Sequence, residues 1–375
     1  MALNLKEQVK NLIERSNFVL IPLPKDPGAD AIASAWVLNK YLKKLQKNVD
    51  ICGKLEDKRY DFLIKEFQIK DSIELIAPFV ISVNLKNTKL KEFKYDIEDS
   101  ILKIYLYSEN KEFKKEDVSL KEGDPEYDLV ITLDTPELES LGDLYYKYPT
   151  FFLSTPIINI DNSPANENYG TVNFIDTKSS SITEILYNFL KSENFDINQE
   201  ISTALLSGII EKTNCFRKSN LSPLTFNTIG ELVDKGADRE YLIKELYQNK
   251  PLSAVKLWGR ALSKLKTLTE RAEIVWTILP NEDFKRSKAG GLDLKLIFSD
   301  FASYIPSTKI AFIIAEYEPK KIRVLISNND FKIDLYKIFN IYSIKKARDF
   351  YYFEVIGQDI LDVEREVVDL IKNNI

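Results

Sequence analysis

The sequence has 375 residues, which is enough for two domains of ordinary size. Its net charge of −5, from 52 basic and 57 acidic residues, excludes a generally basic surface for polyanions, although a single basic groove remains compatible. The absence of histidine excludes Ser-His-Asp and Cys-His catalysis, histidine zinc sites and mixed His/Asp metal pairs. Cys52 and Cys215 have no CxxC spacing, which argues against a disulfide framework and favours a reducing compartment.

The beginning of the chain predicts an amphipathic helix over residues 1–14. This segment has no apolar core of the kind that a signal peptide carries. No stretch approaches the roughly 20 uncharged apolar residues that a membrane span needs. We therefore expect a cytoplasmic protein that makes no membrane contact.

The first half of the chain alternates apolar runs with helical patterns. A strand at residues 18–21 is followed by a proline-rich loop at 22–29 and by helical periodicity over 31–45. Almost continuously apolar runs are typical of strands that are covered on both faces. Further strands are predicted at 49–52, 129–133 and 157–160, and further helices at 180–191, 200–211 and 237–248. The predicted fold is α/β, a parallel sheet wrapped by helices.

A long insertion separates the second and third of these strands. Residues 78–124 contain two strand-like runs, 79–85 and 101–107, joined by a polar stretch. Residues 109–123 are highly charged, and they predict a mobile, solvated loop. We interpret the insertion as a β-rich excursion that offers a surface to a protein partner.

The last third of the chain predicts a second, smaller α+β domain. Its strands are expected at residues 273–279, 309–316, 321–327 and 351–356, and its helices at 294–304 and from Ile360 onward. The predicted organisation is a first domain over 1–250, a linker region over 251–272 and a second domain over 273–375.

Four short motifs follow one another along the first domain. They read PKDPGADAIASA (24–35), DLVITLDT (128–135), INIDNSPAN (158–166) and GIIEKTNCF (208–216). In this order they resemble the motifs of the DHH/DHHA1 phosphoesterases, which include RecJ-like exonucleases, nanoRNases and cyclic-dinucleotide phosphodiesterases. The resemblance covers most of residues 15–250 outside the insertion. It implies a DHH domain followed by a DHHA1-like domain, although the GGGH loop of the family has no equivalent near 340–343.

The chain departs from the family pattern at the metal-binding positions. Asp30, Asp134 and Asp161 stand where the family has aspartates, whereas both imidazoles of the Asp-His-His motif are missing. The metal-binding aspartate of the fourth motif falls on Lys212. The family reaction uses two Mn²⁺-type ions held by carboxylates and imidazoles. We therefore expect no bound cofactor and no catalytic residue. If a metal binds, it is a weakly held Mg²⁺ or Mn²⁺ between Asp30 and Asp134.

The candidates for ligand binding are polar side chains within or beside these motifs. Lys212 replaces the charge of the metal in an anion-binding pocket, or it only neutralises a relic site or points outward. Its ammonium is expected within about 4 Å of Asp30 or Asp134. Asn162, Ser163 and Asn166 of the third motif either donate to a phosphate or serve as turn residues. The full set of candidates is Asp26, Ser34, Asn162, Ser163, Asn166 and Lys212.

Two functions remain open at this point. The first is an inactive or impaired DHH protein that binds a nucleotide, a short single-stranded nucleic acid or a protein partner through a retained cleft between the domains. The second is an active metal-dependent phosphoesterase that uses Asp26, Asp30, Asp134 and Asp161 around a reduced metal site, on short nucleic acid or cyclic dinucleotides. A purely structural protein without a ligand is a third possibility, and oligomerisation is compatible with each.

Overall fold

The computed structural model describes residues 4–55, 57–64, 67–73, 75, 78–122, 127–217, 221–268, 273–303, 308–330, 332–347 and 350–374. The chain forms two compact units. The first contains Met1–Lys54 and Leu63–Arg239, and the second contains Leu55–Phe62 and Glu240–Ile375. No helix within the described ranges is both long enough and apolar enough to cross a bilayer.

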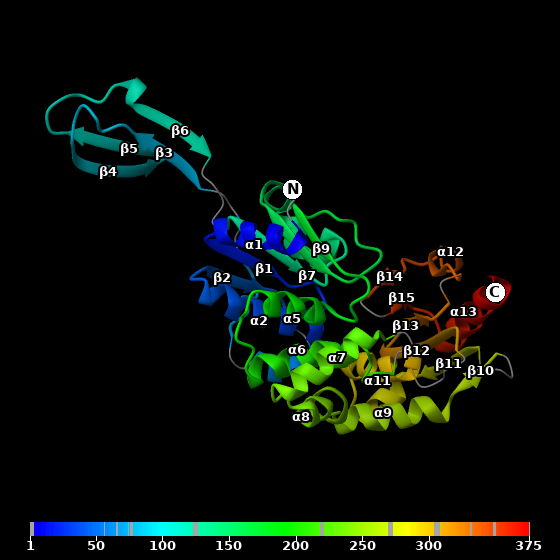
Figure 1. Ribbon diagram of the computed structural model, residues 1–375. Helices are drawn as coiled ribbons and strands as arrows, with labels where there is room; N and C mark the ends of the chain where they lie inside the picture. Colours follow the sequence, from blue (N-terminus) through cyan, green and yellow to red (C-terminus); the bar gives the residue numbers. More distant parts are fainter. Residues whose placement is uncertain are drawn as a thin grey trace. The chain divides into compact units, whose positions relative to one another are not determined.

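A parallel sheet forms the centre of the first unit, as predicted from the sequence, and it has five strands where four were expected (Figure 1). All neighbouring pairs are parallel, and the order is β2-β1-β7-β8-β9. The strands are β1 (Phe18–Pro22), β2 (Asn48–Cys52), β7 (Leu129–Leu133), β8 (Ile157–Asp161) and β9 (Val172–Ile175). Strand β9 was not predicted from the sequence, because a four-residue edge strand that buries only alternate side chains gives a weak apolar signal.

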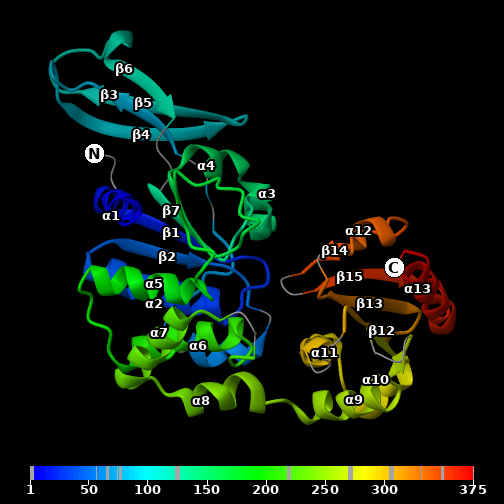
Figure 2. The same ribbon diagram turned by 45° about the vertical axis from the view of Figure 1, so that its right-hand side comes forward.

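Helices cover this sheet. The short helices α3 and α4 pack on one face (Figure 2), where Phe151 and Phe152 of α4 belong to the same buried apolar cluster as Leu20 and Val130. Helices α2, α5 and α6 form a second packed group, and Gly208 of α6 allows its close approach to α2. The helices of the unit are α1 (Leu5–Arg15), α2 (Ala29–Lys44), α3 (Asp143–Lys147), α4 (Pro149–Ser154), α5 (Ile182–Ser192), α6 (Gln199–Lys212) and α7 (Pro223–Asp234).

The insertion consists of two antiparallel ribbons that do not pair with the five-stranded sheet in the described part of the chain. One ribbon pairs β3 (Phe79–Val83) with β6 (Val118–Glu122), and the other pairs β4 (Leu90–Glu98) with β5 (Ile101–Ser108). The prediction of a mobile loop over 109–123 is wrong for β6, because its apolar residues pair with those of β3. Gly123 and Asp124 lie outside the described residues.

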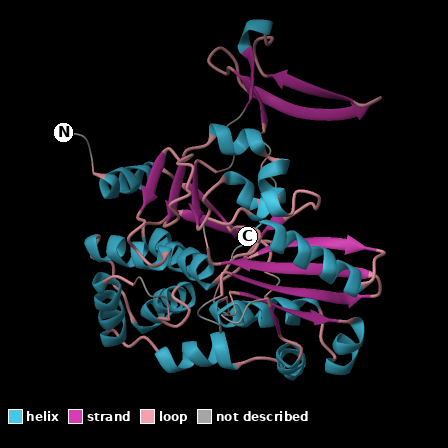
Figure 3. Ribbon diagram, turned by 90° about the vertical axis from the view of Figure 1, so that its right-hand side faces the viewer, coloured by secondary structure: helices cyan, strands magenta, loops and turns pink. Residues whose placement is uncertain are grey.

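The second unit is the smaller α+β part of the fold. Its six-stranded mixed sheet has the order β10-β11-β12-β13-β15-β14, in which only β11 and β12 are parallel. The strands are β10 (Lys266–Thr267), β11 (Ile274–Leu279), β12 (Ile310–Glu318), β13 (Lys321–Asn328), β14 (Lys345–Lys346) and β15 (Tyr351–Ile356). The helices are α8 (Arg239–Ile243), α9 (Leu252–Ser263), α10 (Asn281–Ser287), α11 (Gly291–Ser303), α12 (Leu335–Ile338) and α13 (Ile360–Asn374), with a π-helical turn after α8 at Lys244–Gln248. Helix α13 lies across one face of this sheet (Figure 3).

The boundary between the units differs from the prediction. Residues 251–272 were expected to be a linker, but they contain α9, whose Ala254, Leu257 and Ala261 are buried in the second unit. These residues have helical spacing, so the apolar face of α9 belongs to a core and not to a connection. A short segment from the first half of the chain, 55–62, also belongs to the second unit, and the ring of Phe62 packs edge-to-face on Tyr241.

Candidate functional site at the carboxyl edge of the parallel sheet

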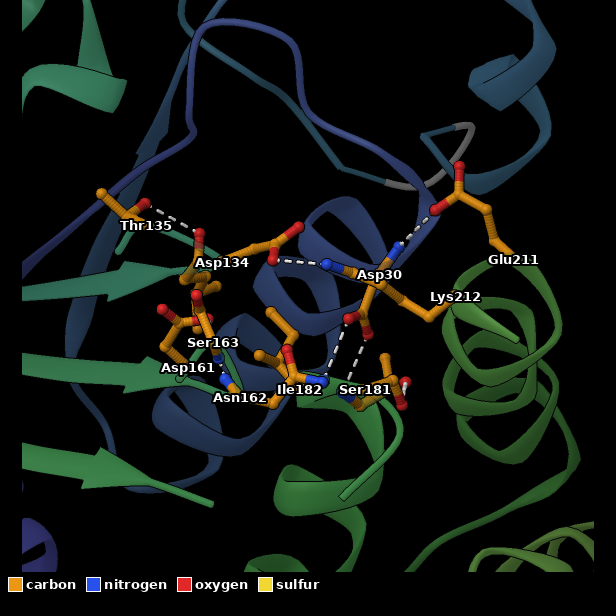
Figure 4. A network of polar contacts seen from close by, with 12 residues as sticks. Asp30, Asp134, Thr135, Asp161, Asn162, Ser163, Ser181, Ile182, Glu211 and Lys212 are labelled. Carbon is orange, nitrogen blue, oxygen red and sulfur yellow. Dashed lines mark hydrogen bonds and ion pairs between the residues drawn. The ribbon is translucent and has the colours of Figure 1, made fainter. Parts of the chain in front are cut away.

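Three carboxylates meet at one edge of the five-stranded sheet. Asp134 follows the last residue of β7, Asp161 ends β8, and Asp30 lies in the first turn of α2, which follows β1 (Figure 4). Because β1, β7 and β8 are neighbours in a parallel sheet, their carboxyl ends lie together. The first three motifs thus bring their aspartates to one edge of the sheet.

Lys212 joins this group from the last turn of α6. Its Nζ lies 2.6 Å from Oδ1 of Asp134, and the two side chains expose only 19% and 12% of their surface. A charge-assisted hydrogen bond of this length is among the strong polar contacts of proteins. Asp134 itself has a positive φ of 52°, which turns the chain sharply after β7. The expected contact between Lys212 and one of the motif aspartates is confirmed, and the partner is Asp134.

Asp30 has a different partner. Its fully buried carboxylate accepts hydrogen bonds from the backbone N–H groups of Ile182 and Thr183, both at 2.9 Å. These groups belong to the first turn of α5, where N–H groups have no partner within the helix. Burial raises the pKa of Asp30 to about 6, the Lys212 ammonium lowers it, and the charge of Asp134 adds to the increase. Asp30 therefore fixes α5 to α2.

Asp161 accepts three hydrogen bonds from its own loop. Its carboxylate receives the backbone N–H groups of Asn162 at 2.7 Å and Ser163 at 3.2 Å, and the side-chain amide of Asn166 at 2.6 Å. Burial raises the pKa of this carboxyl above its ordinary value, whereas the hydrogen bond from Asn166 lowers it. The loop after β8 is thus organised around Asp161.

The candidates of the third motif have internal partners. The side-chain amide of Asn162 donates to the carbonyl of Ser179 at 3.1 Å, and Oγ of Ser163 accepts from Ala165 N at 3.2 Å. Asn166 connects Asp161 to Asn159 of β8, whose amide donates to Asn166 Oδ1 at 3.0 Å. Such contacts are typical of turn residues.

Two further candidates lie elsewhere. Ser34 is fully buried, one turn after Asp30 in α2, and its Oγ has no hydrogen-bond partner in the described part of the chain. A side chain at this depth cannot contact a ligand without a rearrangement of the helices, so we correct the expectation that Ser34 binds one. Asp26 is exposed in the loop before α2, in contrast to the buried Asp30.

Several members of this network were not among the candidates predicted from the sequence. Glu211 accepts from the backbone N–H of Asp30 at 3.4 Å, and the hydroxyl of Tyr169 lies 2.8 Å from Oγ1 of Thr132. Asn159 could have been found, because it precedes Asp161 by two residues and so points to the same face of the sheet. Glu211 belongs to the fourth motif and Tyr169 follows the third, so their place in the motifs was the available signal.

The donor set does not fit the pair of divalent cations that the motif resemblance implies. The Asp134 carboxylate holds an ammonium, and those of Asp30 and Asp161 each hold N–H donors. Within the described ranges, no three side chains of the metal-binding types are arranged to hold a metal ion.

Comparison with known proteins identifies the family. The N-terminal domain of the DHH family matches residues 19–209, a little over half of the chain. The chain belongs to the DHH family. The match includes Asp30, Asp134 and Asp161, and it ends three residues before Lys212.

Two curated relatives of this DHH protein are bacterial. It is 31% identical over 134 residues to the "bifunctional oligoribonuclease and PAP phosphatase NrnA" of Bacillus subtilis (strain 168), covering 35% of this chain and 41% of that protein. It is 28% identical over 151 residues to a "probable bifunctional oligoribonuclease and PAP phosphatase NrnA" of Streptococcus mutans, covering 40% and 46%. The DHH protein thus matches less than half of the length of these relatives.

A solved structure shares the fold of this DHH protein over nearly its full length. The crystal structure of an exopolyphosphatase-related protein from Bacteroides fragilis superimposes with a TM-score of 0.72 and 14% sequence identity. It covers 99% of this chain and 95% of that one. At this level of identity the likeness concerns the fold alone.

Proposed function

We propose that this DHH-family protein is a binding protein in which the metal-dependent hydrolysis of the family is lost or severely impaired. The observation that carries the proposal is the 2.6 Å contact between Lys212 and Asp134. It sits where the family motif has a metal-binding aspartate, and both members are largely buried.

The positive charge of Lys212 disfavours the binding of a metal ion at this edge of the sheet. Two unit charges about 4 Å apart interact by about 4 kcal/mol at an effective dielectric constant of about 20. A divalent cation beside the ammonium would therefore meet roughly twice that repulsion. The remaining carboxylates would also lose the N–H donors that they now accept from α5 and from the loop after β8.

The same electrostatics argue against a phosphate ligand at this edge. Among the residues labelled in Figure 4, the ammonium of Lys212 stands beside the carboxyl groups of Asp30, Asp134, Asp161 and Glu211. Lys212 is already paired with Asp134, so a nucleotide phosphate would meet net negative charge. This favours a protein partner over a nucleotide, and it directs the binding function to the insertion, 78–124.

Hydrolysis assays test the loss of activity. The full chain is incubated with Mn²⁺ and either a short RNA, PAP or a cyclic dinucleotide, with the Bacillus subtilis relative as a positive control. We expect turnover at the level of the buffer, equal to that of Asp134→Asn. Robust Mn²⁺-dependent turnover that disappears in Asp134→Asn would overturn the proposal.

One observation favours the alternative of an active phosphoesterase with a reduced metal site. Asp30, Asp134 and Asp161 keep their positions at one edge of the sheet, as an enzyme of this family would need. Thermal melting with and without Mn²⁺ separates the two cases, because a ligand that binds only the folded state raises the melting temperature. We expect no shift for the wild type and a small shift for Lys212→Asp, whereas Lys212→Met serves as the control that removes charge without adding a carboxylate.

A further inference from the structure

The β4–β5 ribbon of the insertion has one entirely apolar face. Residues that face each other across an antiparallel pair share a face of the sheet. The pairs Phe93 with Leu106, Tyr95 with Ile104 and Ile97 with Leu102 therefore line one side. Five of these side chains expose between 37% and 66% of their surface, and the sixth, Leu106, is half-buried. We call these six residues the apolar ribbon face.

The opposite face of the same ribbon carries its charges. They are three acids and two lysines, Glu92, Lys94, Asp96, Glu98 and Lys103. The charges already form pairs within the ribbon, since Lys94 lies 3.1 Å from Glu92 and Lys103 lies 2.5 Å from Glu98. Strand β5 adds Ile101, Tyr105 and Tyr107 to the charged face. Strand β4 alternates apolar and charged residues from Glu92 to Glu98, which is typical of a strand that buries one face. The described part of the chain does not bury that face.

The exposed apolar area is large enough for a stable interface. An aromatic side chain buries on the order of 150–250 Å². The two aromatic and four aliphatic side chains of this face are about half exposed, so together they present roughly 600 Å². This area lies at the lower end of the roughly 600–1,000 Å² per partner of a standard interface. It also lies at the upper end of the ~300–600 Å² of the largest apolar patch on a typical monomer.

We propose that the apolar ribbon face packs against the same face of a second copy of this chain. The inference rests on the proposed binding role of the insertion and names the partner. The face carries no charge with which to select a charged partner, and interfaces between identical subunits are the more apolar class. A two-fold axis lets one patch serve both copies and closes the assembly as a dimer.

A membrane surface is the other apolar partner that could cover the apolar ribbon face, but it matches this ribbon less well. Segments that lie on membranes combine an apolar face with a polar face rich in lysine and arginine. The charged face of this ribbon has more acids than bases, and its lysines are paired with those acids. Packing of two sheets face to face, about 10 Å apart, is in contrast an ordinary arrangement for such ribbons.

The test is the molar mass of the full chain in solution, measured by light scattering across a range of concentrations. We expect a dimer for the wild type. Tyr95→Lys, on the apolar ribbon face, should raise the dimer dissociation constant at least about 100-fold, because it introduces two charges into the centre of the interface. Tyr105→Lys is the matched control, since Tyr105 lies on the charged face of the same ribbon and is 42% exposed. It should stay dimeric.

A monomeric wild type, a Tyr95→Lys variant that remains dimeric, or equal dissociation of both variants would each overturn the proposal. If Tyr95→Lys fails to fold, replacement of Leu90–Ser108 by a short Gly-Ser turn supplies the monomer test. The assay is independent of catalysis. If the chain is a monomer and does not hydrolyse the substrates, only the dimer proposal fails. If it is a dimer with robust Mn²⁺-dependent hydrolysis, only the proposed loss of activity fails.

Discussion

The carboxyl edge of the parallel sheet and the β4–β5 ribbon differ in which side chains they bury and which they expose. At the sheet edge, charged groups are buried, and Asp30, Asp134 and Asp161 each accept donors from within the chain. On the ribbon, apolar side chains such as Tyr95 and Ile97 are exposed, while the charges beside them form their own pairs.

This difference indicates where the molecule meets other molecules. A buried carboxylate that already holds its donors loses them when it binds something else. An exposed apolar face gains free energy from burial, at about 25 cal/mol per Å² removed from water. The polar contacts at the sheet edge therefore stabilise the fold, whereas the exposed face of the ribbon is suited to binding a partner.

The largest expected effect comes from Lys212→Met. Removing the ammonium leaves Asp134 largely buried without its partner, close to Asp30, and should lower the free energy of unfolding by about 3 kcal/mol. Urea unfolding measures it. The control is Lys191→Met, which removes a lysine from an exposed pair with Glu231 and should cost no more than about 1 kcal/mol.

A second substitution sharpens the result for Lys212. In Lys212→Met/Asp134→Asn both charges are gone, and asparagine tolerates the positive φ at this position. Much of the lost stability should return, because replacing both members of a buried pair costs far less than removing one. Equal losses in Lys212→Met and Lys191→Met would show that the ion pair has no structural role.

The next largest effect is expected from Asp30→Ala. The substitution leaves the N–H groups of Ile182 and Thr183 buried without an acceptor, and should cost about 2 kcal/mol in metal-free buffer. Asp26→Ala, in the exposed loop nearby, should change stability by less than about 0.5 kcal/mol. If the Asp30 carboxylate had no structural role, Asp30→Ala would instead raise the free energy of unfolding, because its loss would relieve repulsion from Asp134.

A smaller effect concerns the pH dependence of Asp161. Burial raises the pKa of this carboxyl in the folded protein, with the Asn166 hydrogen bond acting against it. A raised pKa stabilises the fold below the unfolded value, near 4, and that contribution is lost as the pH rises through the folded pKa. The stability of the wild type relative to Asp161→Asn should therefore fall as the pH rises above about 4. Urea unfolding at several pH values measures this difference, and a rise would contradict the sign of the shift.

The smallest effect is expected from removal of the ribbon. Replacing Leu90–Ser108 with a short turn should change the unfolding free energy of the remaining chain by less than about 0.5 kcal/mol, because β4 and β5 pair only with each other among the described strands. Thermal and urea unfolding of the monomeric state measures it. A loss of several kcal/mol would mean that the ribbon supports the fold, which would end the contrast with the sheet edge.

The sequence was sufficient to predict the parts of the fold that rest on local patterns. The apolar runs identified β1, β7 and β8, and the order of the motifs brought Asp134 and Lys212 together. The pattern in β4 was also visible as an alternation, but its many charges made the segment look like a solvated connection.

Other features depend on segments far apart in the chain. Asp30 accepts its two backbone hydrogen bonds only because the first turn of α5, about 150 residues later in the chain, lies beside α2. Ser34 lies on the same helix and looks like a site residue in the motif, but the packing of the helices buries it. The assignment of 55–62 to the second unit likewise follows from tertiary contacts that no local pattern encodes.

Lys212 is proposed to take the place of a metal ion beside Asp134. Anomalous diffraction from crystals soaked in Mn²⁺ tests this proposal, because it locates the metal and the lysine in one experiment. We expect no anomalous peak between Asp30 and Asp134, with Lys212 still bonded to Asp134. A manganese ion bound between these two carboxylates, with the side chain of Lys212 displaced, would contradict it.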